Sequence, residues 1–172
     1  MTLSEASFRL DTLARQSSPL GITLVLAVFA VMPMPLPDYS ILAPGFALMA
    51  VYYWTIHRPD LLTTPMVFTV GLTIDMLGGG PAGLNVVLLL LTHFGLRSQR
   101  RVFLAKTFIV AWWGFCLTAL IAQAAAAFLV LLARGGLPPL GPLTMQWMLT
   151  VLLYPAMTAL LAGAQRAFLR QV

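Results

Sequence analysis

The chain has 172 residues, of which 60% are hydrophobic and only 9% are charged, and its mean hydropathy is +0.92. A soluble domain usually carries about 25% charged residues, so this composition excludes a soluble globular protein and indicates an integral membrane protein. The net charge of +5 does not indicate nucleic-acid binding, because the ten basic residues are scattered between apolar runs.

Six apolar segments follow one another along the chain and are predicted to be transmembrane helices. They cover residues 19–36, 40–57, 62–77, 82–96, 105–133 and 143–164. The third and fourth are short for a full crossing, so thinning of the bilayer or shielding by neighbouring helices is expected there. The predicted fold is therefore a single all-α membrane domain, a bundle of six transmembrane helices.

The basic residues predict the orientation of this bundle. Nine of the ten precede the first segment or follow the second, fourth and sixth, and Arg134 is the tenth. Lys and Arg gather on the cytoplasmic side, so both termini are predicted to be cytoplasmic. A basic cytoplasmic loop between the fourth and fifth segments is predicted to contain Arg97, Arg100, Arg101 and Lys106. It is interpreted as a topology signal that also contacts anionic lipids, with docking of a cytoplasmic filament as the alternative.

Few residues are suited to catalysis. Of the five acidic residues only Asp75 belongs to a predicted span, and both histidines, His57 and His93, lie near inner ends of spans, where an interfacial position is expected. Catalytic and metal constellations need groups within hydrogen-bond reach of each other. One cysteine, Cys116, allows neither an intramolecular disulfide nor a CxxC pair. The sequence therefore predicts no enzymatic activity, no cofactor and no metal site.

Asp75 stands in the last turn of the third segment, directly before a glycine-rich turn, GGGPAG. A negative charge at a helix C-terminus is unfavourable with the helix dipole, so the position needs compensation. Three interpretations remain open. The carboxylate accepts hydrogen bonds from N–H groups of the glycine loop or of the next helix start, it meets a cation or donor of a partner, or it is hydrated at the interface.

The stretches PDYSILAPGFALMAVYYWTIHRPD and VFTVGLTIDMLGGGPAG resemble the rod shape-determining protein family MreD. The family pattern is a span ending in Tyr–Trp, a short Arg/Pro turn and a G-L-x-x-D-x-x-x-G-x-x-x-G core. The positions that match are Tyr53, Trp54, Pro59, Gly71, Leu72, Asp75, Gly79 and Gly83. The resemblance covers residues 35–97 well, and beyond them only length and hydropathy agree.

This resemblance implies an inner-membrane subunit of the bacterial cell-elongation machinery without enzymatic activity. It implies association with MreC, a bitopic periplasmic protein, and through it with the RodA–penicillin-binding protein synthase and MreB filaments. It also implies a fold like that of the substrate-binding subunits of energy-coupling-factor vitamin transporters. The matched residues would form a partner-binding or structural motif.

Two hypotheses of function compete, and a third, a membrane enzyme acting on lipid-linked precursors, is disfavoured because Asp75 has no second acid, base or metal cluster to act with. The first is a non-catalytic membrane scaffold that binds an MreC-like partner, supported by small residues that permit close helix contact: Gly71, Gly79, Gly83, Gly114 and the alanines at 124–127. The alternative is a small-molecule binding subunit of a transporter, with an outward-facing, vitamin-sized pocket near Asp75. The scarcity of polar residues that would orient a ligand weighs against this alternative.

Overall fold

The structure, a computed structural model, describes residues 19–31, 45–79, 82–104, 108–136 and 139–169 of the chain. At 99–104, 133–134 and 167–169 it describes the backbone alone. Within these ranges the protein contains six helices and no strand, as the sequence predicts. The helices are Pro19–Val31, α3 (Phe46–His57), α4 (Thr64–Gly78), α5 (Leu84–Leu104), α6 (Phe108–Arg134) and α7 (Leu140–Leu169).

Two of the helices, α6 and α7, are long and apolar enough to cross a membrane by length and composition. Three shorter apolar stretches, Pro19–Val31, Thr64–Gly78 and Leu84–Ser98, have fewer than the about 20 residues that a full crossing requires. Each of the six predicted segments overlaps one helix. Six complete membrane crossings therefore stay a prediction.

The prediction of a basic loop between the fourth and fifth segments is wrong for three of its four basic residues. Helix α5 continues past residue 96 to Leu104, so Arg97, Arg100 and Arg101 lie on its last turns rather than in a loop. No glycine or proline interrupts the stretch 96–104, and cations near a helix C-terminus interact favourably with the helix dipole. Lys106 lies outside the described residues.

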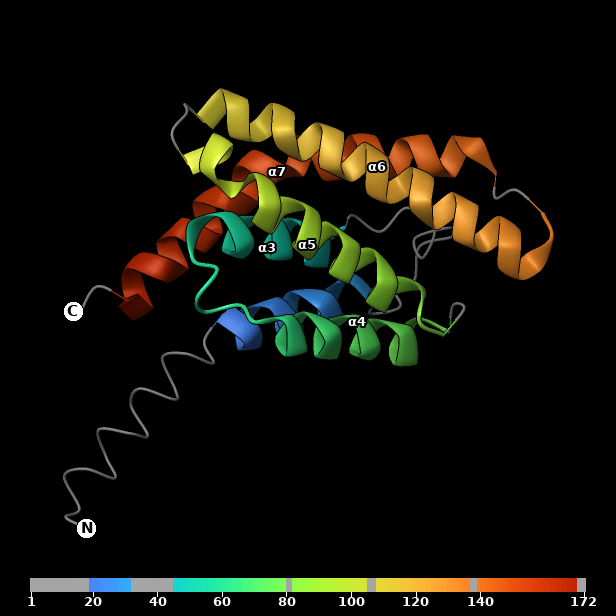
Figure 1. The fold of residues 1–172 in the computed structure, drawn as a ribbon, viewed down its shortest axis with the longest axis horizontal. Helices are drawn as coiled ribbons and strands as arrows, with labels where there is room; N and C mark the ends of the chain where they lie inside the picture. The colour runs from blue at the N-terminus through green and yellow to red at the C-terminus, as the bar shows by residue number, and fades with distance from the viewer. Residues whose placement is uncertain (1–18, 32–44, 80–81, 105–107, 137–138, 170–172) are drawn as a thin grey trace, which may run out of the picture.

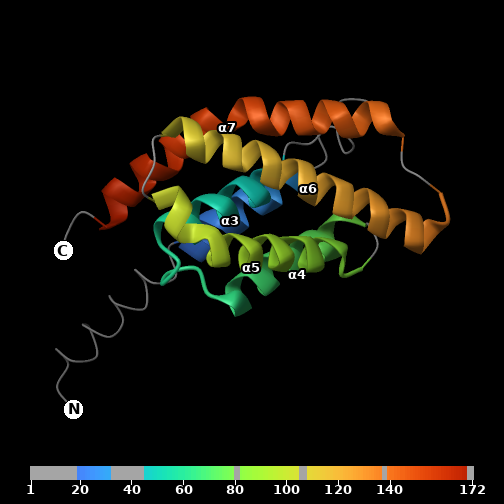
Figure 2. The same ribbon diagram turned by 45° about the horizontal axis from the view of Figure 1, so that its top comes forward.

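The helices run roughly side by side and form a bundle (Figure 1). Helices α6 and α7 lie together on one side, α4 and the helix Pro19–Val31 lie on the opposite side, and α3 and α5 lie between them. After rotation of the molecule, α6 and α7 still lie together on one side, with α4 on the opposite side and α3 between them (Figure 2). Successive helices run in alternating directions, as expected for elements joined by short connections.

Helix α3 is the centre of the bundle, and nine of its twelve residues are buried. Its apolar residues are distributed around the whole helix, a pattern typical of a helix surrounded by others. Tyr52 meets Phe115 of α6 and Tyr154 of α7 edge to face, at ring distances of 5.1 and 5.7 Å. Phe115 and Tyr154 stack at 4.1 Å. These three aromatic rings hold α3, α6 and α7 together.

Hydrogen bonds from side chains also join α6 to α7. The indole N–H of Trp112 donates to the Val151 carbonyl at 3.2 Å, and that of Trp147 donates to the Cys116 carbonyl at 3.3 Å. Nearer the other end of the pair, the amide of Gln123 donates to Gln146 Oε1 at 2.9 Å. Such interhelical bonds stabilise helix pairs where hydrocarbon offers no competing partner.

Candidate functional site

The strongest sequence motif forms a helical hairpin in which α4 and α5 pack side by side in opposite directions (Figure 1). Asp75 is one turn from the end of α4 and is buried, with 8% of its surface exposed. Its side chain points at the first residues of α5 rather than along its own helix, since all of its hydrogen-bond partners lie there.

The carboxylate of Asp75 accepts four hydrogen bonds from the start of α5. The backbone N–H groups of Gly83 and Asn85 donate to Oδ2 and Oδ1, each at 3.0 Å. The side-chain amide of Asn85 donates to Oδ1 at 2.9 Å, and the N–H of Val86 donates to Oδ2 at 3.3 Å. This is the first of the three interpretations left open by the sequence.

These bonds explain why an acid stands at the C-terminal end of a helix. The first N–H groups of any helix lack intrahelical partners, and the N-terminal end of the dipole favours negative charge. Asp75 is unfavourable for α4 but occupies the N-terminal end of α5, where its charge is stabilised. The residue therefore caps its neighbour and fixes the register of the hairpin.

Gly71 makes this capping geometrically feasible. It lies four residues before Asp75, on the same face of α4, and it too is buried against α5. A Cβ atom at Gly71 would lie 2.6 Å from the Val86 Cα and 2.9 Å from the Val86 N. No side chain fits in that space, so glycine is what lets the two backbones approach closely enough for the carboxylate to reach the amides.

Gly79 and Gly83 belong to the glycine-rich turn between α4 and α5. A Cβ at either position would meet nothing within 4 Å, so neither glycine is needed for close contact between helices of this chain, and contact with a partner helix stays a prediction. Both have positive φ, 61° and 88°, a backbone conformation that side chains disfavour. Gly79 ends α4 in the left-handed conformation and Gly83 starts the turn into α5, so they shape the connection between the helices.

Of the remaining motif residues, Tyr53, Trp54 and Pro59 lie in the interior at the other end of the bundle, whereas Leu72 of α4 is 41% exposed. Tyr53 is 4% exposed, donates its hydroxyl to Gln165 Oε1 of α7 at 2.8 Å and stacks on His57 at 4.3 Å. Trp54 is 1% exposed, and its indole N–H has no partner among the described residues. Pro59 is buried in the turn between α3 and α4. Because they are buried, Tyr53, Trp54 and Pro59 contribute to the packing of the bundle.

The sequence interpretation missed two polar contacts. Asn85 donates a hydrogen bond from its side-chain amide to Asp75. Asn85 is the second residue of α5, and a polar side chain at this helix start was the signal available in the sequence. His93, expected at the interface, is fully buried, and its Nδ1 lies 3.0 Å from the Thr55 hydroxyl of α3. The interfacial prediction for His93 is therefore wrong, because α3 and α5 pack directly at this level, whereas His57 is exposed.

Three basic side chains, those of Arg58, Arg97 and Arg166, are exposed. The turn after α3 and the C-terminal parts of α5 and α7, which contain them, lie at the same end of the bundle (Figure 1). The α4–α5 turn and the C-terminal end of α6 lie at the opposite end. One end of the bundle thus presents several cations to its surroundings.

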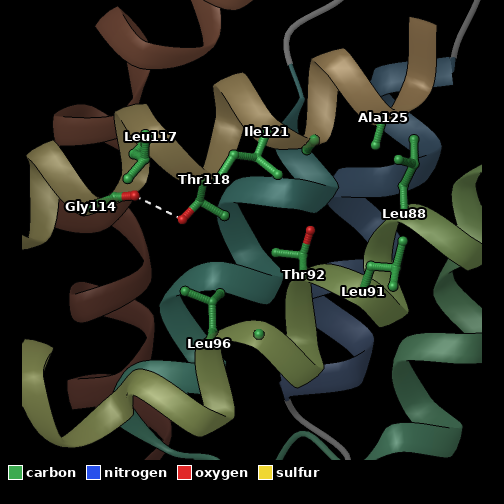
Figure 3. A pocket seen from close by; sticks show the side chains of 11 residues that line it. Leu88, Leu91, Thr92, Leu96, Gly114, Leu117, Thr118, Ile121 and Ala125 are labelled. Carbon is green, nitrogen blue, oxygen red and sulfur yellow. Dashed lines mark hydrogen bonds between the residues drawn. The ribbon is translucent and has the colours of Figure 1, made fainter. Parts of the chain in front are cut away.

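A cavity of about 230 Å³ lies between α5 and α6 (Figure 3). Its lining is apolar except for two threonines, Thr92 and Thr118, and it contains neither Asp75 nor any other residue of the hairpin motif. The described residues include no group of three His, Cys, Asp or Glu side chains that would hold a metal ion. The arrangement is suited to packing and to apolar contact within a membrane.

Comparison with known proteins gives one match. No curated protein and no solved structure matches the chain. The model of the family described as rod shape-determining protein MreD matches residues 12–163, which include the hairpin, the central helix, α6 and most of α7. The protein therefore belongs to the MreD family of rod shape-determining membrane proteins.

Proposed function

We propose that this protein is a non-catalytic scaffold subunit in the inner membrane, within the peptidoglycan-synthesising complex that elongates rod-shaped bacterial cells. Membership in the MreD family supports a part in determining rod shape. The observation that carries the scaffold proposal is the hydrogen bonding of Asp75. The carboxylate of the one acid within a predicted span is engaged by four N–H donors of the same chain, so it serves the architecture of the hairpin.

The proposal includes six membrane crossings with both termini in the cytoplasm. The shared position of Arg58, Arg97 and Arg166 at one end of the bundle supports it, because Lys and Arg accumulate on the cytoplasmic side. The basic end of α5 would also contact anionic lipid headgroups, at about 1 kcal/mol per basic residue. The helices that are short for a full crossing would lie where the bilayer thins or neighbouring helices shield them.

The partner in this proposal is an MreC-like bitopic protein, through which the subunit would be linked indirectly to RodA, the penicillin-binding protein and the MreB filament. The extensive apolar surface supports a partner within the membrane. On α6 alone, Ile109, Trp113, Leu117 and Ile121 are between 59 and 68% exposed. The alternative of a vitamin-binding subunit has less support, because the cavity between α5 and α6 offers only two hydroxyl groups to orient a ligand.

Co-purification tests the scaffold proposal. The full-length chain is expressed with a C-terminal affinity tag together with the MreC-like protein of the same organism, and membranes are solubilised in mild detergent. We expect the MreC-like protein to elute with the tagged chain. Recovery no greater than that obtained with an unrelated tagged six-span protein would contradict the proposal.

A further inference from the structure

We propose that the groove between α5 and α6 is the docking site for the transmembrane helix of a single-span partner. The inference rests on the proposed function, since it gives the scaffold's membrane partner a specific position. The groove is the cavity of about 230 Å³ shown in Figure 3, and its walls include Leu91, Leu117 and Ile121, which are 59 to 61% exposed.

Small residues form the α6 side of the groove at a regular spacing. Gly114, Thr118 and Ala122 follow one another at intervals of four residues, so they lie along one face of the helix, and all three line the groove. Gly95 lies opposite on α5. Stripes of this kind let a second helix backbone approach closely, which is how transmembrane helices associate. The α6 lining from Gly114 to Ala125 is about 16 Å long at 1.5 Å per residue, room for about three helical turns.

An independent polar feature points into the same groove. Four threonines are buried in the described part of the protein, Thr23, Thr55, Thr92 and Thr150. Thr23 and Thr150 bond carbonyls one turn earlier, and Thr55 bonds His93. Thr92, only 9% exposed, forms no hydrogen bond with the described residues, and its hydroxyl points across the groove towards α6 (Figure 3).

This hydroxyl favours a helix over a lipid as the occupant. An unpaired polar group in an apolar environment is unfavourable, and a lipid acyl chain offers it no acceptor. A helix that packs against the small residues brings backbone carbonyls and polar side chains to this depth. Thr118 differs from Thr92, because its hydroxyl already bonds the Gly114 carbonyl at 2.8 Å.

The position of the groove in the bundle supports the same occupant. Only 11% of the residues in the apolar stretch of α6 are buried, against 28% in α7, so α6 is the more open of the two long helices. Arg97 follows Leu96, the last groove residue of α5, and is exposed without an ion pair to the described residues. A carboxylate or amide at the cytoplasmic end of the partner helix would complement this charge.

Filling the groove tests the proposal with a matched pair of variants. A Cβ at Gly95 or at Gly163 of α7 would meet nothing within 4 Å, and both glycines are exposed within helices. Leucine at either position is therefore compatible with the fold, but only Gly95→Leu fills the groove. We expect Gly95→Leu to reduce recovery of the MreC-like partner about ten-fold, equivalent to about 1.4 kcal/mol, while Gly163→Leu retains wild-type recovery.

The outcomes separate this inference from the proposed function. If the wild-type chain recovers the partner and Gly95→Leu recovers it equally well, the groove proposal is overturned and the scaffold proposal stands. If the wild-type chain recovers no partner, the scaffold proposal itself fails, and the groove proposal with it. Should Gly95→Leu not fold, judged by gel filtration and thermal unfolding, Ala122→Leu in the groove and Ala159→Leu at an exposed position of α7 form a second pair.

A photoreactive amino acid at position 122 identifies the occupant in native membranes. We expect an adduct with the mass of this chain plus that of the MreC-like protein, and no such adduct from position 159 on α7. An adduct of twice the mass of this chain would show that a second copy occupies the groove. Adducts with lipid alone would show that the groove is filled by acyl chains, and either result would overturn the proposal.

Discussion

At the scale of single residues, Asp75 is a capping group shared between two helices. Three of its four hydrogen bonds satisfy backbone N–H groups at the start of α5 that no intrahelical acceptor reaches, and the fourth comes from the side-chain amide of Asn85. In hydrocarbon these groups would have no water to replace the carboxylate, so their pairing within the chain matters more than at an aqueous surface. Because its carboxylate is hydrogen-bonded within the chain, the acid is tolerated within a predicted span.

We expect Asp75→Asn to destabilise the protein by about 1–3 kcal/mol, because an amide supplies one acceptor oxygen where the carboxylate supplies two. The loss of negative charge at the N-terminal end of α5 acts in the same direction. Thermal unfolding of the purified protein in detergent measures the effect. Asp60→Asn is the control, since Asp60 is exposed in the turn between α3 and α4. Equal midpoints for the two variants would show that the hydrogen bonds of Asp75 contribute nothing measurable.

At the scale of elements, the hairpin of α4 and α5 depends on the contact at Gly71. The α4 backbone lies so close to Val86 that a single methyl group does not fit. Gly79 and Gly83 then turn the chain with backbone angles that other residues disfavour. The three glycines and Asp75 act together, because the close approach, the turn and the capping bonds each require the same placement of the two helices.

Gly71→Ala is expected to destabilise the protein by about 1–3 kcal/mol, because α5 must move away from α4 to accommodate the added carbon. Gly163→Ala is the matched control: it lies in open space within α7, where the higher helix propensity of alanine stabilises a helix by up to about 1 kcal/mol. Thermal unfolding midpoints of the two variants should therefore shift in opposite directions. A Gly71→Ala midpoint at or above that of the wild type would contradict the close approach.

At the scale of the whole molecule, α3 is the helix around which the others assemble. It contacts α5, α6 and α7, and the hydroxyl of Tyr53 bonds Gln165 near the C-terminal end of α7. The outer surfaces of α5, α6 and α7 present large apolar side chains, such as Phe94, Trp113 and Leu152. Such a surface is unsuited to water and is consistent with a membrane protein.

Reporter fusions test the proposed topology. A fluorescent protein that matures only in the cytoplasm should be fluorescent when fused after residue 172. Alkaline phosphatase, active only outside the cytoplasm, should be active when inserted after Gly136, between α6 and α7, and inactive at the C-terminus. The expectation follows from the cations gathered at one end of the bundle. Phosphatase activity at the C-terminus would contradict cytoplasmic termini.

The amino-acid sequence by itself determined the class of protein and the position of its helices. Apolar runs separated by proline, glycine and basic residues identify helical segments, because a hydrocarbon environment forces backbone groups to pair within each segment. The order of residues from Gly71 to Gly83 also pointed to the MreD family, and the family match confirms it. These are properties of local composition and order.

Only the tertiary structure decided what the motif residues do. Sequence placed Asp75 at a helix end, but it did not decide between the three interpretations of the carboxylate. Nor did it show that the Val86 backbone leaves no room for a side chain at Gly71. It also placed His93 at an interface, although α3 covers it. Neighbouring helices pack through contacts between residues distant in the chain, and no local pattern specifies which polar groups meet across them.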